Sequence, residues 1–140
     1  MITRQDIIDE ARKWAGVPFR HQGRSARGID CIGLVLVTAQ ALKLTTVDVK
    51  NYRRTAAGRN FSELFAEHMD PVSLGDIRDS DVMLFKFGAF ECHCAIVTDS
   101  ARGRIIHAYQ PYGKTVEEYL SEDSALYVCR TKAFRFRGVD

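Results

Sequence analysis

The first fifteen residues place apolar side chains at the spacing of an amphipathic helix. The residues on its apolar face are Ile7, Ala11, Trp14 and Ala15, with Ile8 beside them. Thr3 and Asp6 have the spacing of a capping box, with Asp in place of the usual Glu. Gly16 and then Pro18 follow, which is the usual order at a helix C-terminus. The pattern therefore predicts a helix over residues 3–15.

The densest apolar stretch of the chain runs from Ile32 to Val37. It predicts a helix over 29–44 that is apolar on most sides and therefore buried. Asp30 is placed to cap this helix, and Cys31 would lie in its first turn. There the helix dipole favours a thiolate, which makes Cys31 a candidate nucleophile. The alternative is that Cys31 is a small core residue, as many free cysteines are.

The second half of the chain is patterned in short runs typical of strands. Strands are predicted over 82–87, 92–98, 104–109 and 125–136, with turns over 71–77 and 99–103. Short helices are predicted after Asn60, with Phe61, Leu64 and Phe65 inward, and over 115–120 with Thr115 as cap. Helices followed by a set of strands indicate an α+β fold.

Length and composition indicate one soluble domain over residues 1–140. The net charge of +2 is too small and too evenly spread for nucleic-acid binding. The four basic residues near the C-terminus alternate with Phe134 and Phe136, which favours an edge strand with a charged outer face. The sequence has no apolar run long enough for a membrane span and no signal peptide at its start. We therefore expect synthesis in the cytoplasm, with free thiols.

Two of the four histidines are placed to meet on one hairpin. His93 and His107 are 14 residues apart, with the predicted turn midway between them. Antiparallel pairing would set them nearly opposite, close enough for the rings to touch. With Cys31 they make a candidate nucleophile–base–orienter triad, although spacing does not say which histidine is the base. The alternative is that two histidines face each other by chance.

The triplet Cys92-His93-Cys94 also raises the question of a metal site. Strand alternation argues against one, because it puts the two cysteines on one face and the histidine on the other. No metal and no cofactor is therefore expected. His68 is predicted to be a surface histidine, because nothing near it in sequence completes a metal or catalytic set.

A polar loop over residues 17–28 runs directly into Asp30 and Cys31 and is a candidate wall of a binding cleft. Its polar members are Arg20, His21, Gln22, Arg24, Ser25 and Arg27. The alternative for this segment is a solvated connection.

Several pieces together resemble the NlpC-like family of cell-wall cysteine peptidases, which has a papain-like fold. They are Gly16-Val17-Pro18-Phe19, Gly23-Arg24-Ser25, Gly28-Ile29-Asp30-Cys31-Ile32-Gly33-Leu34-Val35, Leu74-Gly75-Asp76, His93-Cys94-Ala95-Ile96-Val97 and Ile106-His107-Ala108. The resemblance implies a nucleophile helix packed on an antiparallel sheet. It also implies Cys31 as nucleophile, His93 as base and His107 as the third, polar residue.

Two positions differ from the family pattern: Ile32 stands where Ser is usual and Phe19 where Tyr is usual. His21 or Gln22 could supply a replacement hydrogen-bond donor to the oxyanion, and the backbone N–H of Cys31 another. The family's substrates are peptidoglycan stem peptides, often cut between D-glutamate and diaminopimelate. Since such a ligand is anionic, Arg20, Arg24 and Arg27 are candidate carboxylate binders.

The compact domain resembles the versions carried by phage tails and gene-transfer particles. This implies tail hub or tail-tip proteins as partners and action at the cell wall from within a particle. A structural tail-tip component with a blocked or inactive site is the alternative from another class. An amidase or a thiol acyltransferase of the same fold is also open.

Overall fold

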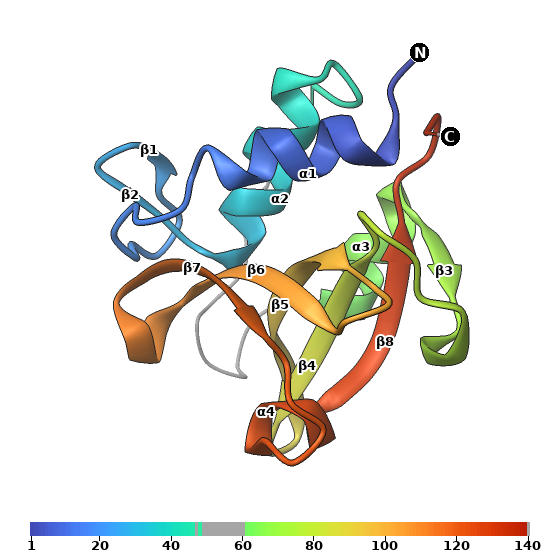
Figure 1. The fold of residues 1–140 in the computed structure, drawn as a ribbon. Coiled ribbons are helices and arrows are strands. Elements are labelled where there is room, and N and C mark those ends of the chain that lie inside the picture. The colour runs from blue at the N-terminus through green and yellow to red at the C-terminus, as the bar shows by residue number, and fades with distance from the viewer. Residues whose placement is uncertain (47, 49–60, 140) are drawn as a thin grey trace.

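A six-stranded antiparallel sheet forms the centre of the protein, with the three longer helices on one of its faces and a short helix near the C-terminus packed on the other (Figure 1). The structure, a computed structural model, describes residues 1–46, 48 and 61–139. The helices are α1 (Arg4–Arg12), α2 (Cys31–Ala41), α3 (Phe61–His68) and α4 (Ala125–Val128), with 3-10 turns η1 (Leu74–Asp76) and η2 (Gln110–Tyr112). The sheet runs β3 (Asp70–Val72), β8 (Arg130–Arg135), β4 (Val82–Phe87), β5 (Phe90–Asp99), β6 (Arg104–Tyr109) and β7 (Lys114–Tyr119). A separate small hairpin pairs β1 (Arg24–Ser25) with β2 (Gly28–Ile29). The α+β class predicted from the sequence is confirmed.

The start of α1 has the predicted capping box. The backbone N–H of Thr3 donates to Asp6 Oδ2 at 2.9 Å, and the N–H of Asp6 donates to Thr3 Oγ1 at 3.1 Å. The predicted central helix is also present but shorter than 29–44, because Ile29 belongs to β2 and the helix ends at Ala41. The predicted cap at Asn60 lies outside the described residues.

Three predictions about the C-terminal third are wrong. Residues 115–120 do not form a helix, because Lys114–Tyr119 pairs with β6 as a strand. Residues 125–136 do not form one strand, because Ser124 caps the short helix α4 before β8 begins at Arg130. Strand β8 is not an edge strand either, since β3 pairs with its outer side. The turn predicted over 71–77 likewise contains part of β3 and the 3-10 turn η1.

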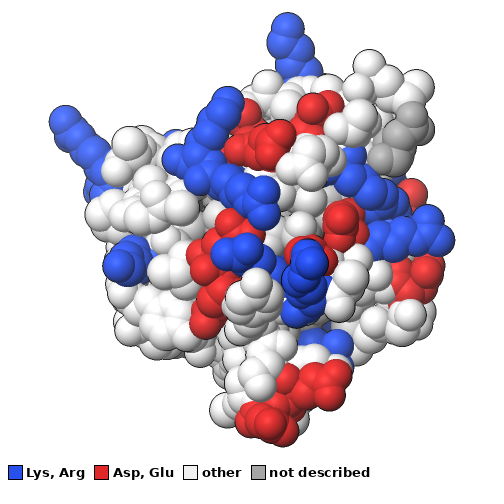
Figure 2. All heavy atoms as spheres, viewed as in Figure 1, with Lys and Arg blue, Asp and Glu red and all other residues white. Residues whose placement is uncertain are grey.

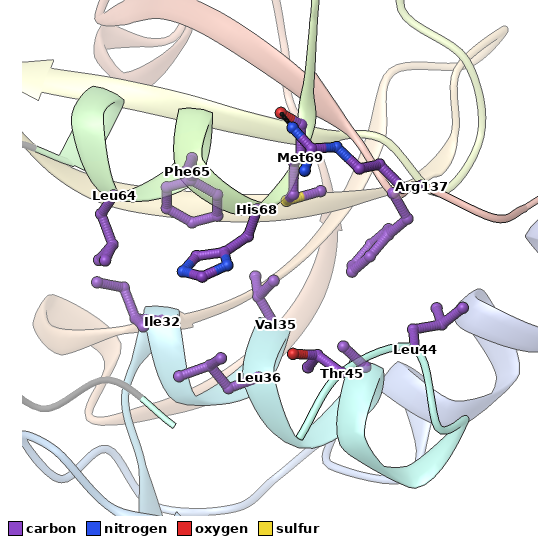
Figure 3. A pocket seen from close by; sticks show the side chains of 12 residues that line it. Ile32, Val35, Leu36, Leu44, Thr45, Leu64, Phe65, His68, Met69 and Arg137 are labelled. Carbon is purple, nitrogen blue, oxygen red and sulfur yellow. Dashed lines mark hydrogen bonds between the residues drawn. The ribbon is translucent and has the colours of Figure 1, made fainter. Parts of the chain in front are cut away.

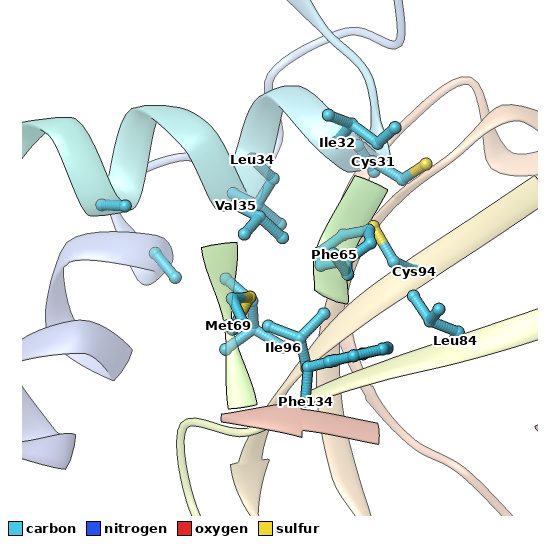
Figure 4. Close-up of a cluster of buried hydrophobic side chains, with 14 of the residues drawn as sticks. Cys31, Ile32, Leu34, Val35, Phe65, Met69, Leu84, Cys94, Ile96 and Phe134 are labelled. Carbon is cyan, nitrogen blue, oxygen red and sulfur yellow. The ribbon is translucent and has the colours of Figure 1, made fainter. Parts of the chain in front are cut away.

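The sheet has a hydrophobic cluster on each face. Leu34 and Val35 of α2 pack with Ile96 and Phe134 in the larger cluster, between the sheet and the helices (Figure 4). The smaller cluster on the opposite face is Met83, Phe85, Ala95, Val97 and Ile105. Because successive strand residues alternate between these faces, both sides of β4 and β5 are buried.

One fully buried carboxylate ties the first helix to the last strand. Asp81 accepts hydrogen bonds from Arg135 Nε at 2.9 Å and Nη2 at 2.8 Å, and from Arg4 Nη1 at 3.3 Å. The backbone N–H of Arg78 donates to its Oδ2 at 2.9 Å. The Asp81 side chain is 0% exposed, whereas its two cationic partners are about one-fifth exposed.

Charged groups of both signs are interspersed over the face shown in Figure 2, without a broad field of one sign. Among the helices of the described residues, none has the length and apolar character needed to cross a bilayer.

Gly33, in the first turn of α2, leaves room for the loop that precedes the helix. A Cβ built there would lie 2.6 Å from the backbone oxygen of Gly23, closer than real Cβ contacts come. We expect Gly33→Ala to destabilise the protein by about 1–3 kcal/mol, although alanine favours a helix by about 1 kcal/mol. Urea unfolding measures this. Gly75→Ala, whose nearest neighbour would be 3.6 Å away, is the control, and equal effects of the two changes would contradict the clash.

Candidate active site

Cys31 is the first residue of α2, where a polar loop meets a buried helix. Asp30 caps this helix with its Oδ1, which accepts from the backbone N–H of Gly33 at 2.8 Å. Cys31 is 6% exposed and its side chain belongs to the larger hydrophobic cluster. Its position at the helix N-terminus is the one predicted from the sequence, with the free backbone N–H groups of the first turn around it.

The same carboxylate holds the preceding loop against the helix. The backbone N–H of Gln22, a residue with φ of 60°, donates to Asp30 Oδ2 at 2.7 Å. Arg24 Nη1 donates to Oδ1 at 3.1 Å, and His21 Nδ1 lies 3.8 Å from Oδ2. Asp30 itself is buried. Residues 21–24 are therefore held against the start of α2, beside Cys31.

The five residues of this loop that were predicted to face a substrate differ in their surroundings. His21 and Gln22 lie at the helix tip, each partly buried. Arg24 is only 13% exposed and also pairs with Asp48, from Nε to Oδ1 at 2.9 Å, so its guanidinium is held by two carboxylates. Arg27 is exposed, as is Arg20. The exposed pair is the better placed to meet an anionic ligand.

His93 and His107 are in direct contact, as the hairpin spacing predicts. His93 Nε2 lies 2.8 Å from His107 Nδ1, and both side chains are buried. Phe85 and Tyr109 pack around the His93 ring, with centroids 5.4 and 4.9 Å away, and Phe87 stacks on it at 6.0 Å. The pair is thus held in one geometry by aromatic neighbours and shielded from water.

Glu118 extends this pair into a chain of four side chains. His107 Nε2 lies 2.6 Å from Glu118 Oε2, and the Tyr112 hydroxyl donates to Glu118 Oε1 at 3.1 Å. Sequence reasoning missed Glu118 because it treated 115–120 as a helix. The alternation of side chains along a strand would have indicated Glu118. His107 pairs with Val116, and Glu118, two residues further along β7, lies on the same face of the sheet as Val116 and His107.

The Cys31 thiol lies against the part of β5 that carries His93. Burial raises the pKa of Cys94 well above its usual range, and its hydrogen bond and electrostatic interaction with Cys31 raise that pKa further. Burial also raises the pKa of Cys92, again with a contribution from Cys31. Cys31 is therefore close to both chain neighbours of His93. In the part of the chain that the structure describes, no hydrogen bond joins Cys31 directly to His93.

A β-bulge in β5 adjusts the direction of His93. Phe85 pairs with His93 and Lys86 with Glu91, so Cys92 is an extra residue without a partner on β4. His93 and Cys94 are consecutive strand residues and lie on opposite faces, as expected, and the bulge interrupts the regular alternation at Cys92. Bulges re-aim side chains next to functional sites. Among the described residues, no cluster of three His, Cys, Asp or Glu side chains could hold a metal ion.

An apolar cavity of about 270 Å³ lies between α2 and α3 (Figure 3). Ile32, Val35 and Phe65 line it, and its polar lining residues are Thr45, His68 and Arg137. The His68 side chain is 42% exposed, close to the surface position predicted for it. Cys31, His93 and His107 are not among the lining residues, so this cavity is separate from the candidate site.

Burial determines the protonation of the two histidines. It lowers the pKa of His93 well below its usual range, and the neighbouring His107 lowers it further. It also lowers the pKa of His107, although the hydrogen bond and charge of Glu118 act in the opposite direction. Both imidazoles are therefore neutral near pH 7. A neutral imidazole is the form that can act as a general base.

These shifts predict that the protein loses stability in mild acid. Since the unfolded-state pKa of histidine, about 6.5, exceeds the folded-state pKa of His93, the unfolded chain binds the extra proton. The stability that the neutral His93 contributes to the fold is fully present above about pH 6.5. It is lost as the pH falls below that value, by up to about 1.4 kcal/mol per pH unit for one proton. Urea unfolding between pH 7.5 and 5.5 should show a shallower decline for His93→Gln than for the wild type. His68→Gln is the control, and equal slopes for wild type and His93→Gln would contradict the prediction.

The fold is that of NlpC/p60 domains. The domain of the peptidoglycan hydrolase SagA superposes with a TM-score of 0.67 over 96% of this chain and 99% of that one, at 21% identity. Neither the protein-family models nor the curated proteins contain a match to the chain. This chain therefore resembles NlpC/p60 domains in its fold, although the sequence identity is low.

Two mycobacterial structures show the range of proteins with this fold. The peptidoglycan hydrolase RipB from Mycobacterium tuberculosis matches with a TM-score of 0.69 and 17% identity, over 95% of this chain and 64% of that one. RipD from the same organism matches with a TM-score of 0.59 and 14% identity, over 94% and 95%. RipD is described as a non-catalytic NlpC/p60 domain protein adapted to peptidoglycan binding. The fold therefore includes hydrolases and a binding protein.

Proposed function

We propose that this protein is a cysteine endopeptidase that hydrolyses stem peptides of peptidoglycan. The observation that carries the proposal is a thiol at the N-terminus of α2 beside the strand that bears a buried His93–His107 pair, 2.8 Å apart. The NlpC/p60 fold, shared with the hydrolases SagA and RipB, supports the choice of substrate.

The proposed reaction proceeds through a thioester. The Cys31 proton passes to His93, and the thiolate attacks the carbonyl carbon of the scissile amide. The backbone N–H groups at the start of α2 stabilise the oxyanion. The His93 imidazolium then gives its proton to the leaving amine as the C–N bond breaks. Water, deprotonated by His93, cleaves the thioester, releases the carboxylic acid and restores the thiol.

The exposed cationic residues of the loop before α2 suit an anionic stem peptide. Arg20 and Arg27 are exposed on the loop beside the helix tip, where they can pair with substrate carboxylates. The bond between D-glutamate and diaminopimelate is the proposed point of cleavage, because carboxylates flank it on both sides. A setting in a phage-like tail tip stays a prediction of the sequence.

A non-catalytic role in peptidoglycan binding is the second candidate. Two observations favour it: the RipD fold match and, within the described residues, the lack of a hydrogen bond between Cys31 and His93. The departures at Phe19 and Ile32 are consistent with it. Catalytic hydrogen bonds are often long until substrate binds, so the missing bond alone does not exclude catalysis.

Digestion of purified peptidoglycan by the reduced protein tests the proposal. We expect soluble fragments whose masses identify a stem-peptide bond, and no fragments after the protein's thiols are alkylated with iodoacetamide. Sedimentation with insoluble peptidoglycan measures binding in parallel. A folded, reduced protein that sediments with peptidoglycan but releases nothing would support the second candidate instead.

A further inference from the structure

The carboxylate of Glu118 reaches the histidine pair from outside the proposed triad. It lies on β7, at the edge of the sheet, and its side chain is 32% exposed, whereas His107 is fully buried. One carboxylate oxygen faces His107 Nε2 at 2.6 Å and the other receives the Tyr112 hydroxyl at 3.1 Å. Both oxygens of Glu118 are therefore engaged, and the carboxylate is fixed in front of one ring nitrogen.

This contact fixes which nitrogen of His107 carries the proton. An ionised carboxylate only accepts hydrogen bonds, so the 2.6 Å contact requires a hydrogen on His107 Nε2. Since a neutral imidazole carries a single N–H, His107 Nδ1 is then bare and can only accept. The opposite tautomer would place the bare Nε2 against Glu118 Oε2, bringing two acceptors together at that distance.

The tautomer of His107 in turn determines the tautomer of His93. His107 Nδ1 lies 2.8 Å from His93 Nε2, so a bare Nδ1 requires the hydrogen of His93 to be on Nε2. Nδ1 of a neutral His93 is then the unprotonated nitrogen. The proposed reaction needs this nitrogen, because Nε2 is already bonded to His107 and only Nδ1 is left to take a proton from a thiol.

We propose that Glu118 is a positioning residue, which sets the tautomer of His93 through His107. The effect of Glu118 on catalysis rests on the proposed function, whereas the assignment of the two tautomers rests on the contact distances alone. Without an acceptor at residue 118, His107 can carry its hydrogen on Nδ1 and donate it to His93 Nε2. His93 then holds its own hydrogen on Nδ1 and cannot act as the base.

The neighbouring strand residue provides a matched control. Glu117 lies on the opposite face of β7, where its carboxylate receives Arg12 at 2.9 and 3.0 Å and lies 3.4 Å from Arg104 Nε. Glu117 and Glu118 thus carry the same charge on the same strand, but only Glu118 contacts the histidines. Replacing either one removes a carboxylate from β7.

The first test is the tautomeric state of both rings, read from the ¹⁵N shifts of the imidazoles at pH 7.5. In the wild type we expect His93 and His107 to be protonated at Nε2 and bare at Nδ1. Glu118→Val, a residue suited to a strand, should give mixed tautomers, whereas Glu118→Gln keeps an oxygen acceptor and should retain the wild-type state. Glu117→Val should leave both rings unchanged.

The second test is the rate of peptidoglycan cleavage. Glu118→Val should lower kcat about 10- to 100-fold, as removal of the hydrogen-bond partner of a metal-binding histidine does, with little change in KM. Glu118→Gln should restore most of this loss, and Glu117→Val should stay within about twofold of the wild type.

The outcomes separate this inference from the proposed function. A hydrogen on Nδ1 of either ring in the folded wild type would overturn the inference without any variant. Unchanged tautomers and kcat in Glu118→Val would overturn it while leaving the peptidase proposal intact. A wild type that shows the expected tautomers but cleaves no peptidoglycan would keep the tautomer assignment and reject the peptidase.

Discussion

Cys31→Ala is expected to reduce the release of peptidoglycan fragments by at least about 10³-fold, because a covalent route cannot start without its nucleophile. Cys31→Ser should lose nearly as much, since a serine hydroxyl at this position would not ionise near neutral pH. The burial of the Cys31 side chain among core residues gives alanine a site that it can fill, so the fold should persist. Mass spectrometry of released fragments and circular dichroism of the variants measure the two effects.

Cys129→Ala is the control for a general effect of thiol loss. Cys129 follows α4, and its thiol donates to the carbonyl oxygen of Ala125 at 3.3 Å, so it belongs to a local turn. This variant should cleave at the wild-type rate. If Cys31→Ala kept measurable cleavage of the same bond, Cys31 would not be the nucleophile and the thioester route would be wrong.

Asp81→Ala is expected to destabilise the protein by about 3–5 kcal/mol, a large part of the 5–15 kcal/mol typical of a domain. The substitution removes the fully buried carboxylate that is the common acceptor of Arg4 and Arg135 and of one backbone N–H. Both arginine side chains are about four-fifths buried, so each would lose a charged partner in a largely dry site. Urea unfolding gives the free-energy difference.

Asp70→Ala is the matched control for the loss of an aspartate–arginine pair. Asp70 pairs with Arg137 at 3.0 Å, but these side chains are 64% and 53% exposed. An exposed pair contributes about 0–1 kcal/mol, so this variant should be close to the wild type. Similar losses for Asp81→Ala and Asp70→Ala would mean that burial of the Asp81 network has no special effect.

The helices and strands whose ends are determined by neighbouring residues in the chain could be predicted from the sequence. The capping box of Thr3 and Asp6 and the cap at Asp30 determine where α1 and α2 begin, and both involve residues within three positions. The hairpin that joins His93 to His107 also follows from one short turn. These features depend on neighbours in the chain, which a single sequence displays.

The errors arise where distant pairing overrides local preference. Thr115 followed by Glu117 and Glu118 looks like a helix start, but pairing with β6 makes it a strand. Because that segment was assigned to a helix, its carboxylate could not be placed beside His107. The position of β8 inside the sheet depends on β3, a three-residue strand with a proline and little pattern of its own.

The attachment of residues 21–24 to Asp30 has a consequence for how the sequence of this loop can diverge. One buried carboxylate secures the loop through a backbone N–H and one arginine, while the exposed members of the loop, among them Arg20 and Arg27, contribute little to that attachment. If the proposed function holds, substitution of the exposed arginine side chains can alter which peptides are accepted while the attachment to Asp30 is kept. Evolution of ligand preference and preservation of the start of α2 would then act on separate residues of one short segment.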